Sequence, residues 1–317
     1  MRRRTFIQTL LAGGAAASSF SGDGADESPC VRFGVVTDSH YAEKDKAVWP
    51  GSARHYRDSL PKMRQAVDAF NAAGLDFIIE LGDMKDMGAE WRGSGETKTR
   101  RPAEELQAEA IRFLDAIEAE FARFKGPRYH VLGNHDMDCI SKEDFLAHTR
   151  NHGDAAGKTH YAFEVKGVKF IVLDGNFNPD RTPYCRGNFD WTKAFIPDDQ
   201  LRWLEDELKR SRALPTVVFC HQLSDRFSGV SPAICLGNAD KVVGILERNR
   251  QVRAVIQGHH HSGNYSCRRN IHYWTMKAMI EKPFPAHNSY AIVEINRRGD
   301  IRIKGFADCE KRLLPRS

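Results

Sequence analysis

The most constraining feature of the sequence is the turn Leu132-Gly-Asn-His-Asp136, which directly follows the apolar run Tyr129 to Leu132. A short apolar strand normally ends in a simple turn of small polar residues. Here the strand end instead carries an amide oxygen, an imidazole and a carboxylate, all of which are metal-ligand or acid–base groups. We therefore interpret this turn as part of a site that other segments of the chain must complete.

Four further apolar, β-type runs also end in His or Asp. They lead into Asp38-x-His40, Gly82-Asp83-x-x-Asp86, His221 and Gly258-His259-x-His261. Residues two apart on an extended chain point the same way, so each of the pairs 38/40 and 259/261 can share one pocket. Groups at the carboxyl ends of strands face the crevice outside a sheet. Mixed imidazole and carboxylate ligands suit Zn, Fe or Mn, whereas Ca²⁺ prefers oxygen.

Each of these turns has an ordinary explanation when it is taken alone. A Gly-Asp pair after a strand is typical of a tight turn, and a lone His221 is typical of a hydrogen-bonded histidine. The five turns together, however, hold six of the thirteen histidines of the chain. We therefore expect all five to meet around two metal ions.

The spacing of apolar residues predicts strands that alternate with helices in the first half and additional strands in the second. Helices are expected over Leu60–Ala73, Glu104–Phe124, Asp198–Arg210 and Asp240–Glu247, with a further short helix capped at Ser141. Strands are expected over Val31–Val36, Asp76–Leu81, Arg128–Leu132, Tyr161–Val165, Val168–Leu173, Thr216–Cys220, Val252–Ile256, Ile271–Met276, Tyr290–Ile295 and Ile301–Phe306. This order predicts an α/β domain with two sheets between helices, and 317 residues are enough for one large core.

The first residues have the composition of a targeting segment. The basic stretch Arg2 to Ile7 is followed by the weakly apolar run Leu10 to Ala17 and by small residues, which resembles a twin-arginine export signal. We expect residues 1–29 to be the signal and linker and residues 30–317 to be a single domain, exported to the periplasm or outside the cell by the twin-arginine machinery. The alternative is a basic N-terminus of a cytoplasmic protein.

Charge, hydropathy and cysteine spacing argue against several other classes of protein. The formal net charge of +5 is spread without a long basic block, so a nucleic-acid partner is not expected. No later segment has the ~18 apolar residues of a membrane span, so no stable membrane anchor is expected. Seven cysteines without a Cys-x-x-Cys pair indicate neither a zinc ribbon nor a disulfide framework, and their odd number leaves at least one free thiol.

The five motifs, which span the chain from position 38 to 261, resemble those of the calcineurin-like metallophosphoesterases, and every motif position is filled. The resemblance implies a four-layer α/β/β/α sandwich with mixed sheets. It also implies two metal sites. One would be formed by Asp38, His40, Asp83 and His261, and the other by Asp83, Asn134, His221 and His259, so that Asp83 bridges the ions. His135 would act near the leaving oxygen, with Asp86 orienting its ring, while Asp136 supports the turn and touches neither metal.

A centre of this kind implies a hydrolase that uses two Mn, Fe or Zn ions. Its substrates would be small phosphomonoesters, phosphodiesters or nucleotide-type pyrophosphates, attacked by a hydroxide held between the metals. The alternative is a catalytically silent, metal-holding binding protein of the same fold. The presence of His135 and Asp86 argues against it, because a purely structural site needs neither. A nuclease is disfavoured by the absence of a basic stripe.

Two departures narrow the substrate class. Met87 follows Asp86 where the protein Ser/Thr phosphatases of this superfamily have an Arg, and Asp86 itself stands where purple acid phosphatases have a Tyr ligand. The short segments Phe33–Tyr41 and Arg54–Leu60 are instead similar to the branch that contains manganese-dependent ADP-ribose/CDP-alcohol diphosphatases.

Several other polar residues near these motifs have two readings. Arg54, His55 and Arg57 either contact a phosphate or form a solvated helix start, and Asn176 either lines the pocket or belongs to an ordinary turn. His260 is expected to face away from the metals. Cys220 is expected to be a small core residue, because no base stands near it in the sequence to make it a nucleophile.

Overall fold

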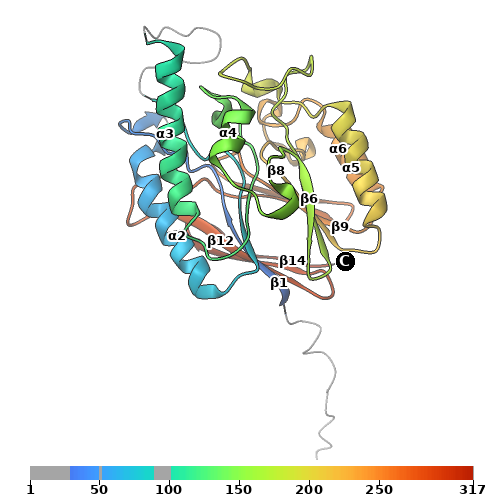
Figure 1. Ribbon diagram of the computed structural model, residues 1–317. Coiled ribbons are helices and arrows are strands. Elements are labelled where there is room, and N and C mark those ends of the chain that lie inside the picture. Colours follow the sequence, from blue (N-terminus) through green and yellow to red (C-terminus); the bar gives the residue numbers. More distant parts are fainter. Residues whose placement is uncertain (1–28, 50–51, 89–100, 317) are drawn as a thin grey trace, which may run out of the picture.

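The structure, a computed structural model, describes residues 29–49, 52–88 and 101–316. Over these residues the chain forms two six-stranded sheets packed face to face, with helices on both outer sides (Figure 1). The expected four-layer α/β/β/α sandwich is therefore confirmed. Of the expected export segment 1–29, all but the last residue lies outside the described part of the chain.

The first sheet has the strand order β14-β13-β12-β1-β4-β5. Its strands are β1 (Pro29–Val36), β4 (Phe77–Glu80), β5 (Arg128–His130), β12 (Ser289–Asn296), β13 (Ile301–Ala307) and β14 (Arg312–Leu314). Strands β1, β4 and β5 are parallel, β12 pairs antiparallel with β1, and β13 and β14 extend the sheet as further antiparallel neighbours. Parallel neighbours need a crossover connection, which helices α2 (Ser59–Ala73) and α3 (Ala103–Phe121) supply on the outer face.

The second sheet has the order β10-β11-β9-β8-β7-β6. Its strands are β6 (Tyr161–Val165), β7 (Val168–Val172), β8 (Thr216–Cys220), β9 (Val252–Gln257), β10 (Asn264–Arg268) and β11 (Ile271–Thr275). The four inner strands are parallel, and the crossovers between β7, β8 and β9 run through α5 (Asp198–Arg210) and α6 (Ala239–Glu247). The short helix α4 (Lys142–His148) begins with a capping box made by Ser141 and Asp144, which confirms the expected cap.

Aromatic side chains fill the space between the two sheets. Phe33 and Phe77 stack on the first sheet with ring centroids 4.7 Å apart, and both meet the edge of Phe170 on the second sheet at 5.5 and 5.0 Å. Edge-to-face and stacked rings of this kind stabilise a core beyond the apolar area that they bury. This packing fixes the two sheets against each other, and with them the strand ends that carry the polar motifs.

Short edge elements were not expected from the sequence. They are the hairpin formed by β2 (Ala47–Trp49) and β3 (Ser52–Arg54), and the edge strands β10 and β14. Three-residue strands are too short to show a period, and β10 is an outer strand without fully buried residues. The ends of predicted elements also shift by a few residues, as at β5, which ends at His130 rather than Leu132.

Lys62 is a buried cation that ties helix α2 to the segment after β11. Its Nζ donates hydrogen bonds to the carbonyl oxygens of Met279, Glu281 and Lys282 at 2.7, 3.0 and 2.7 Å. Burial lowers the pKa of Lys62 to about 8, although nearby carboxylates favour the charged form. The ammonium group is thus still protonated at neutral pH, and all three of its N–H groups are used.

We expect Lys62→Met to lower the free energy of unfolding by about 2–4 kcal/mol, because three carbonyl oxygens lose their buried donor. Urea denaturation followed by circular dichroism measures this change. The matched control is Lys209→Met on the exposed face of α5, which should change stability by about 0.5 kcal/mol or less. Equal effects of the two substitutions would contradict the anchoring role of Lys62.

Candidate metal centre

The five predicted turns meet at the carboxyl ends of five strands, β1, β4 and β5 in the first sheet and β8 and β9 in the second. Backbone hydrogen bonds continue past the strand ends, from Asp38 N to Gly82 O at 3.0 Å and from His40 N to Asp83 O at 2.9 Å. The backbone N–H of His259 donates to Asp38 Oδ2 at 3.0 Å and so joins the two sheets. The motifs are therefore held together by main-chain contacts as well as by side chains.

Four of the predicted ligands have left-handed backbone conformations. Asp38, His40, Asp83 and His259 have φ values of 51°, 46°, 58° and 66°. Such a conformation costs a residue other than glycine about 1–3 kcal/mol, and the conformation persists only where the surrounding structure imposes it. Here the left-handed backbone conformation directs the side chain at each of these strand ends towards one common point.

Glycines allow the motif turns to come this close. A Cβ atom at Gly133 would collide with the backbone nitrogen of Asp83. Gly82 has a φ of 101°, and a Cβ there would lie 2.6 Å from Nδ1 of His221. The glycines of these two motifs are therefore required by the approach of neighbouring turns.

The first expected ligand group converges in the structure. Nε2 of His40 lies 3.7 Å from Asp38 Oδ1 and 3.5 Å from Asp83 Oδ2, and Nε2 of His261 lies 3.5 Å from Asp38 Oδ1. The Nε2 atoms of His40 and His261 face each other at 3.1 Å. Two imidazole nitrogens and two carboxylates aimed at one point form a donor set for a transition-metal ion.

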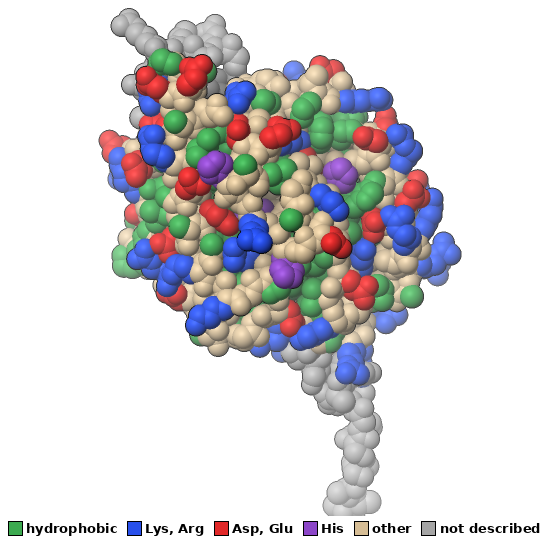
Figure 2. All heavy atoms as spheres, viewed as in Figure 1, with side chains coloured by type: hydrophobic (Ala, Val, Ile, Leu, Met, Phe, Trp, Pro, Cys, Tyr) green, Lys and Arg blue, Asp and Glu red, His purple; other side chains and the backbone are tan. Residues whose placement is uncertain are grey.

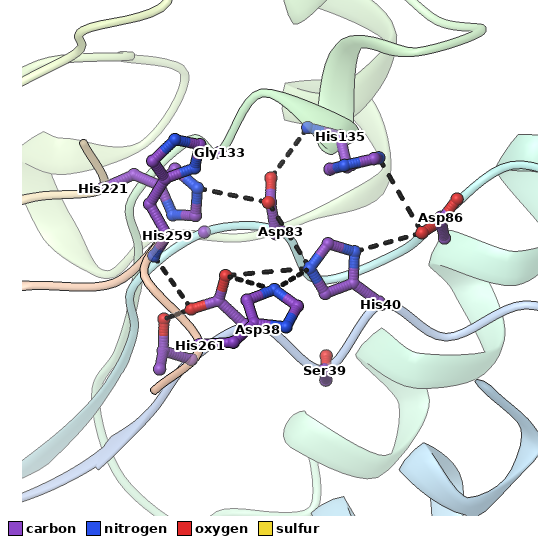
Figure 3. Close-up of polar contacts among 12 residues, drawn as sticks. Asp38, Ser39, His40, Asp83, Asp86, Gly133, His135, His221, His259 and His261 are labelled. Atoms are coloured by element: carbon purple, nitrogen blue, oxygen red, sulfur yellow. Dashed lines mark hydrogen bonds and ion pairs between the residues drawn. The ribbon is translucent and has the colours of Figure 1, made fainter. Parts of the chain in front are cut away.

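The second expected group lies on the other side of Asp83 (Figure 3). His221 Nε2 is 3.2 Å from Asp83 Oδ2, and the rings of His221 and His259 have centroids 5.0 Å apart. Asn134 Oδ1 and His259 Nε2 are buried without a hydrogen-bond partner, and so is Asp38 Oδ1 of the first group. Buried polar atoms are normally paired, so these three atoms fit the coordination of metal ions, and the residues present suit two ions that share Asp83.

The proposed histidine ligands are oriented by partners on their other ring nitrogen. His221 Nδ1 lies 2.8 Å from Leu81 O, His261 Nδ1 lies 2.8 Å from Glu281 Oε1, and His40 Nδ1 lies 3.1 Å from Asp86 Oδ2. With the proton on Nδ1, each Nε2 offers a lone pair to a metal. Glu281 was not found from the sequence, because it stands twenty residues beyond His261 in a segment without a motif.

We expect Glu281→Gln to weaken metal binding by roughly 10- to 100-fold, since the variant loses the charge that makes His261 a stronger ligand. The amide oxygen can still accept from Ser52 Oγ, which lies 2.8 Å from the carboxylate, so the fold should be kept. Titration of metal-free protein with Mn²⁺ measures the affinity. Glu164→Gln on the exposed side of β6 is the control, and an unchanged affinity in Glu281→Gln would refute its role.

The carboxylates of the centre are held in the ionised form. Burial alone would raise the pKa of Asp38 and Asp83, but the surrounding histidines outweigh it and hold both pKa values well below the usual range. Ionised carboxylates are the form that binds metal. The site is therefore ready to accept cations at neutral pH.

His135 is flanked by two carboxylates, of which Asp138 is the nearer. Its Nδ1 lies 2.8 Å from Asp138 Oδ2 and 3.8 Å from Asp86 Oδ2. Burial disfavours the charged ring, but Asp138, Asp86 and Asp83 outweigh it and raise the pKa of His135 to about 9. The ring is 22% exposed, so a substrate can reach it. Sequence reasoning named only Asp86; the Asp three residues after His135, directly after the 3₁₀ turn His135–Met137, was the signal for a second partner.

Asp136 connects the two central turns, which is the supporting place expected for it. Its carboxylate accepts hydrogen bonds from the backbone N–H groups of Asp83, Met84 and Gly133 at 2.9, 2.9 and 2.8 Å. With both oxygens occupied in this way, Asp136 fixes the position of Asp83 relative to Asn134.

The cations singled out near the first motif have different surroundings. Arg54 Nη1 lies 3.2 Å from Asp86 Oδ2, while Arg57 forms an exposed pair with Asp45. Lys44, which sequence reasoning did not single out, lies 2.9 Å from Asp86 Oδ1. Of Arg54, His55 and Arg57, Arg54 thus contacts the centre through Asp86. Lys44 contacts the same carboxylate.

The remaining candidates are explained by packing. Asn176 is buried, and its amide donates to Leu132 O at 2.7 Å and accepts from Gln222 at 2.7 Å, so it supports the strand that leads into the central turn. Burial raises the pKa of the Cys220 thiol to about 12, as expected for an unreactive core residue. His260 belongs to none of the ligand groups found among the described residues.

The surface on the face shown in Figure 2 carries basic and acidic side chains interspersed with each other. Within the described residues, no helix has the length and apolar content needed to cross a bilayer.

Comparison with known proteins gives matches over most of the chain. The family described as Calcineurin-like phosphoesterase matches residues 31–263. A manganese-dependent ADP-ribose/CDP-alcohol diphosphatase of Arabidopsis thaliana is 26% identical over 307 residues, covering 86% of this chain and 93% of that protein. A 3',5'-cyclic-nucleotide phosphodiesterase of Nostoc is 25% identical over 201 residues, covering 63% of this chain and 60% of that protein. Among solved structures, a dimetal phosphatase from Danio rerio has a TM-score of 0.76 at 19% identity and covers 92% of this chain and all of that one.

Proposed function

This chain belongs to the calcineurin-like phosphoesterase family, and on that premise we propose that it is a manganese-dependent hydrolase of small nucleotide-type pyrophosphates. The observation that carries the proposal is the pair of ligand groups that share Asp83 beside the exposed ring of His135. The Arabidopsis diphosphatase, which is similar over nearly its whole length, supports pyrophosphates as the substrate class.

The residues of the centre divide into ligands and groups that face the substrate. One ion would be held by Asp38, His40, Asp83 and His261, and the other by Asp83, Asn134, His221 and His259. When bound, the two ions supply charge neutralisation of the phosphoester and activation of the nucleophile. Asn134 provides a neutral oxygen, which limits the negative charge of the site so that an anionic substrate can enter.

His135 supplies the acid of the reaction. Burial disfavours the charged ring, but the Asp138 and Asp86 carboxylates favour it, and the protonated ring can give its proton to the departing oxygen. Asp138 orients the ring through its contact with Nδ1 at 2.8 Å, and Asp86 places a second negative charge 3.8 Å from the same nitrogen. Lys44 and Arg54 both pair with Asp86 at the edge of the centre and hold its carboxylate in place.

The test is a hydrolysis screen on metal-free protein reloaded with Mn²⁺, Fe²⁺, Zn²⁺ or no metal. We expect turnover of ADP-ribose and CDP-alcohols with Mn²⁺, and none without metal. Turnover of phosphodiesters alone would favour the second candidate, a cyclic-nucleotide phosphodiesterase, to which the Nostoc relative points. Absence of turnover by protein shown to hold metal would refute both.

We also propose that residues 1–29 direct the folded, metal-loaded protein through the twin-arginine machinery to the periplasm or beyond. The support is the sequence Arg2-Arg-Arg-Thr-Phe-Ile7 before a weakly apolar run. Replacing Arg3 and Arg4 by lysine should leave the protein in the cytoplasm. Export of this double variant at the normal level would overturn the proposal.

A further inference from the structure

Lys85 is a buried lysine that contacts the turn carrying His135. It stands between Asp83 and Asp86 in the polar turn after β4, and it has no exposed surface. Its Nζ donates a hydrogen bond to the carbonyl oxygen of His135. Neither the two ligand groups nor the acid of the proposed reaction includes this residue, so its buried charge needs an explanation.

Three lysines among the described residues are buried, and the surroundings of their ammonium groups differ. Lys62 donates to three carbonyl oxygens, and Lys142 pairs with the Asp174 carboxylate. Within the described part of the chain, the Lys85 ammonium group donates to the His135 carbonyl alone. Asp136 is near enough to interact with its charge, but no carboxylate there forms an ion pair with Nζ.

A buried ammonium group without an ion pair is expensive, because it leaves water without a full replacement for its hydration. An apolar side chain of similar volume fills the same space at a lower cost in free energy. The Lys85 charge is used at one point, the carbonyl of His135. Its role is therefore to be sought in what that carbonyl does.

The His135 carbonyl closes the 3₁₀ turn His135–Met137. Besides the hydrogen bond from Lys85, it accepts one from Asp138 N at 3.2 Å. On the other side of the residue, His135 N donates to Asp83 Oδ1 at 2.7 Å (Figure 3). Both backbone polar groups of His135 are thus held. Because Asp138 contacts the His135 ring at Nδ1, the carbonyl also fixes the carboxylate partner of the ring.

A single 3₁₀ turn is a weak element by itself, since its hydrogen bonds have poor geometry. An acid in a reaction centre, however, has to be held within about 0.5 Å of its productive position. A hydrogen bond from a charged donor is roughly twice as strong as one between neutral groups. Lys85 therefore gives this turn the rigidity that its own hydrogen bonds do not supply.

We propose that Lys85 is a positioning residue for His135. Its ammonium group holds the His135 carbonyl, and through the turn it keeps the ring and Asp138 in the orientation from which the ring reaches the departing oxygen. This inference rests on the proposed function and extends it to the support of the acid. Lys85 itself touches no substrate, because it is buried, and its charge stays the same throughout the reaction.

The ligand turns keep their places without the Lys85 ammonium group. The turn of Asp83 is already joined to that of Asn134 by the Asp136 carboxylate, which accepts from the backbone N–H groups of Asp83, Met84 and Gly133. What Lys85 adds is confined to the His135 carbonyl. Loss of its charge is therefore expected to disturb the acid and to leave the metal ligands in place.

Lys85→Met keeps the length of the side chain and removes the charge. It should retain two metal ions per chain by elemental analysis and lower kcat for ADP-ribose about 10- to 100-fold, with little change in KM. The control combines Lys142→Met with Asp174→Asn, which removes another buried ammonium group together with its partner and should change kcat by about 2-fold or less. An unchanged kcat, or loss of metal, in Lys85→Met overturns the proposal.

A second substitution guards against misfolding. If Lys85→Met does not fold, Lys85→Gln takes its place in every assay, since its side chain is one atom shorter and keeps a polar end. The same losses are expected of it, and the same outcomes overturn the proposal.

The double variant Lys85→Met, His135→Ala tests whether Lys85 acts through His135. If it does, Lys85→Met changes kcat by about 2-fold or less in the His135→Ala background, because the side chain that it positions is already absent. A merely structural role predicts the same loss of about 10- to 100-fold in both backgrounds. That additive result overturns the proposal.

Hydrogen exchange of the metal-free protein separates failure of this inference from failure of the proposed function. We expect the backbone amides of residues 134–140 to exchange faster in Lys85→Met than in the wild type, because Asp138 N–H shares the carbonyl that Lys85 holds. The control variant should exchange at the wild-type rate over these residues. Unchanged exchange in Lys85→Met overturns the positioning contact whatever the protein hydrolyses, whereas absence of turnover by the metal-loaded wild type refutes the proposed function.

Discussion

Asp83→Asn is expected to release both metal ions and to lower kcat/KM for any phosphoester substrate by at least about 10³-fold, because two-metal stabilisation of the transition state amounts to several kcal/mol. Asp83 is the only side chain that both expected ligand groups share. Its Oδ2 lies 3.5 Å from His40 Nε2 and 3.2 Å from His221 Nε2. No other carboxylate among the described residues contacts the imidazoles of both groups.

The asparagine side chain is a close match in shape, so the experiment isolates the charge. Asp83 Oδ1 accepts from His135 N at 2.7 Å, and the amide oxygen of asparagine can keep this hydrogen bond. Elemental analysis gives the metal content per chain, and ADP-ribose turnover gives the activity. Asp115→Asn on the exposed face of α3 is the control and should change neither. Two ions per chain in Asp83→Asn would exclude the shared-carboxylate arrangement.

His135→Ala is expected to keep both metal ions and to lower kcat about 10²- to 10⁴-fold, because the departing oxygen loses its proton donor. His135 belongs with Asp86 and Asp138, on the side of Asp83 away from His221 and His259, and its backbone hydrogen bond to Asp83 remains in the variant. This result separates an enzyme from a silent metal-holding protein, in which His135 would have no measurable role.

The leaving group provides an internal control for His135→Ala. A 4-nitrophenolate is acidic enough to depart without protonation, so bis(4-nitrophenyl) phosphate should lose much less turnover than ADP-ribose. Equal losses on the two substrates would indicate that His135 acts by positioning the substrate rather than by giving a proton. Loss of metal from the variant would instead assign His135 to the ligand set.

The sequence predicted the polar turns that meet in the structure and the order of the main elements because both depend on local signals, while the metal-ligand roles of these side chains stay a prediction. Each ligand motif follows an apolar run that forms a strand whatever its neighbours are, and the helical stripes of α2, α3 and α5 are long enough to show their period. The hairpin β2–β3 and the edge strand β14 were missed because three residues show no period.

The partners of the ligands were harder to find. Glu281 contacts His261 from the segment after β11, which Lys62 in helix α2 binds through the Glu281 carbonyl and which Ser52 and Ala53 bind through the Glu281 carboxylate. Nothing in the local sequence of Glu281 distinguishes it from a surface glutamate. Asp138 stands three residues after His135 and so has a local sequence signal, whereas the family resemblance implies Asp86 as the partner of His135.

The turn Gly133-Asn-His-Asp136 shows what the sequence determines and what the tertiary structure adds. The sequence alone determined that an amide, an imidazole and a carboxylate follow a strand, because a strand end is encoded by neighbouring residues. Only the tertiary structure decided their separate places: Asn134 Oδ1 unpaired and buried, His135 beside Asp138, and Asp136 clamped onto the turn of Asp83. The physical reason is that these places depend on which strand ends meet across two sheets, and that depends on the packing of the whole core.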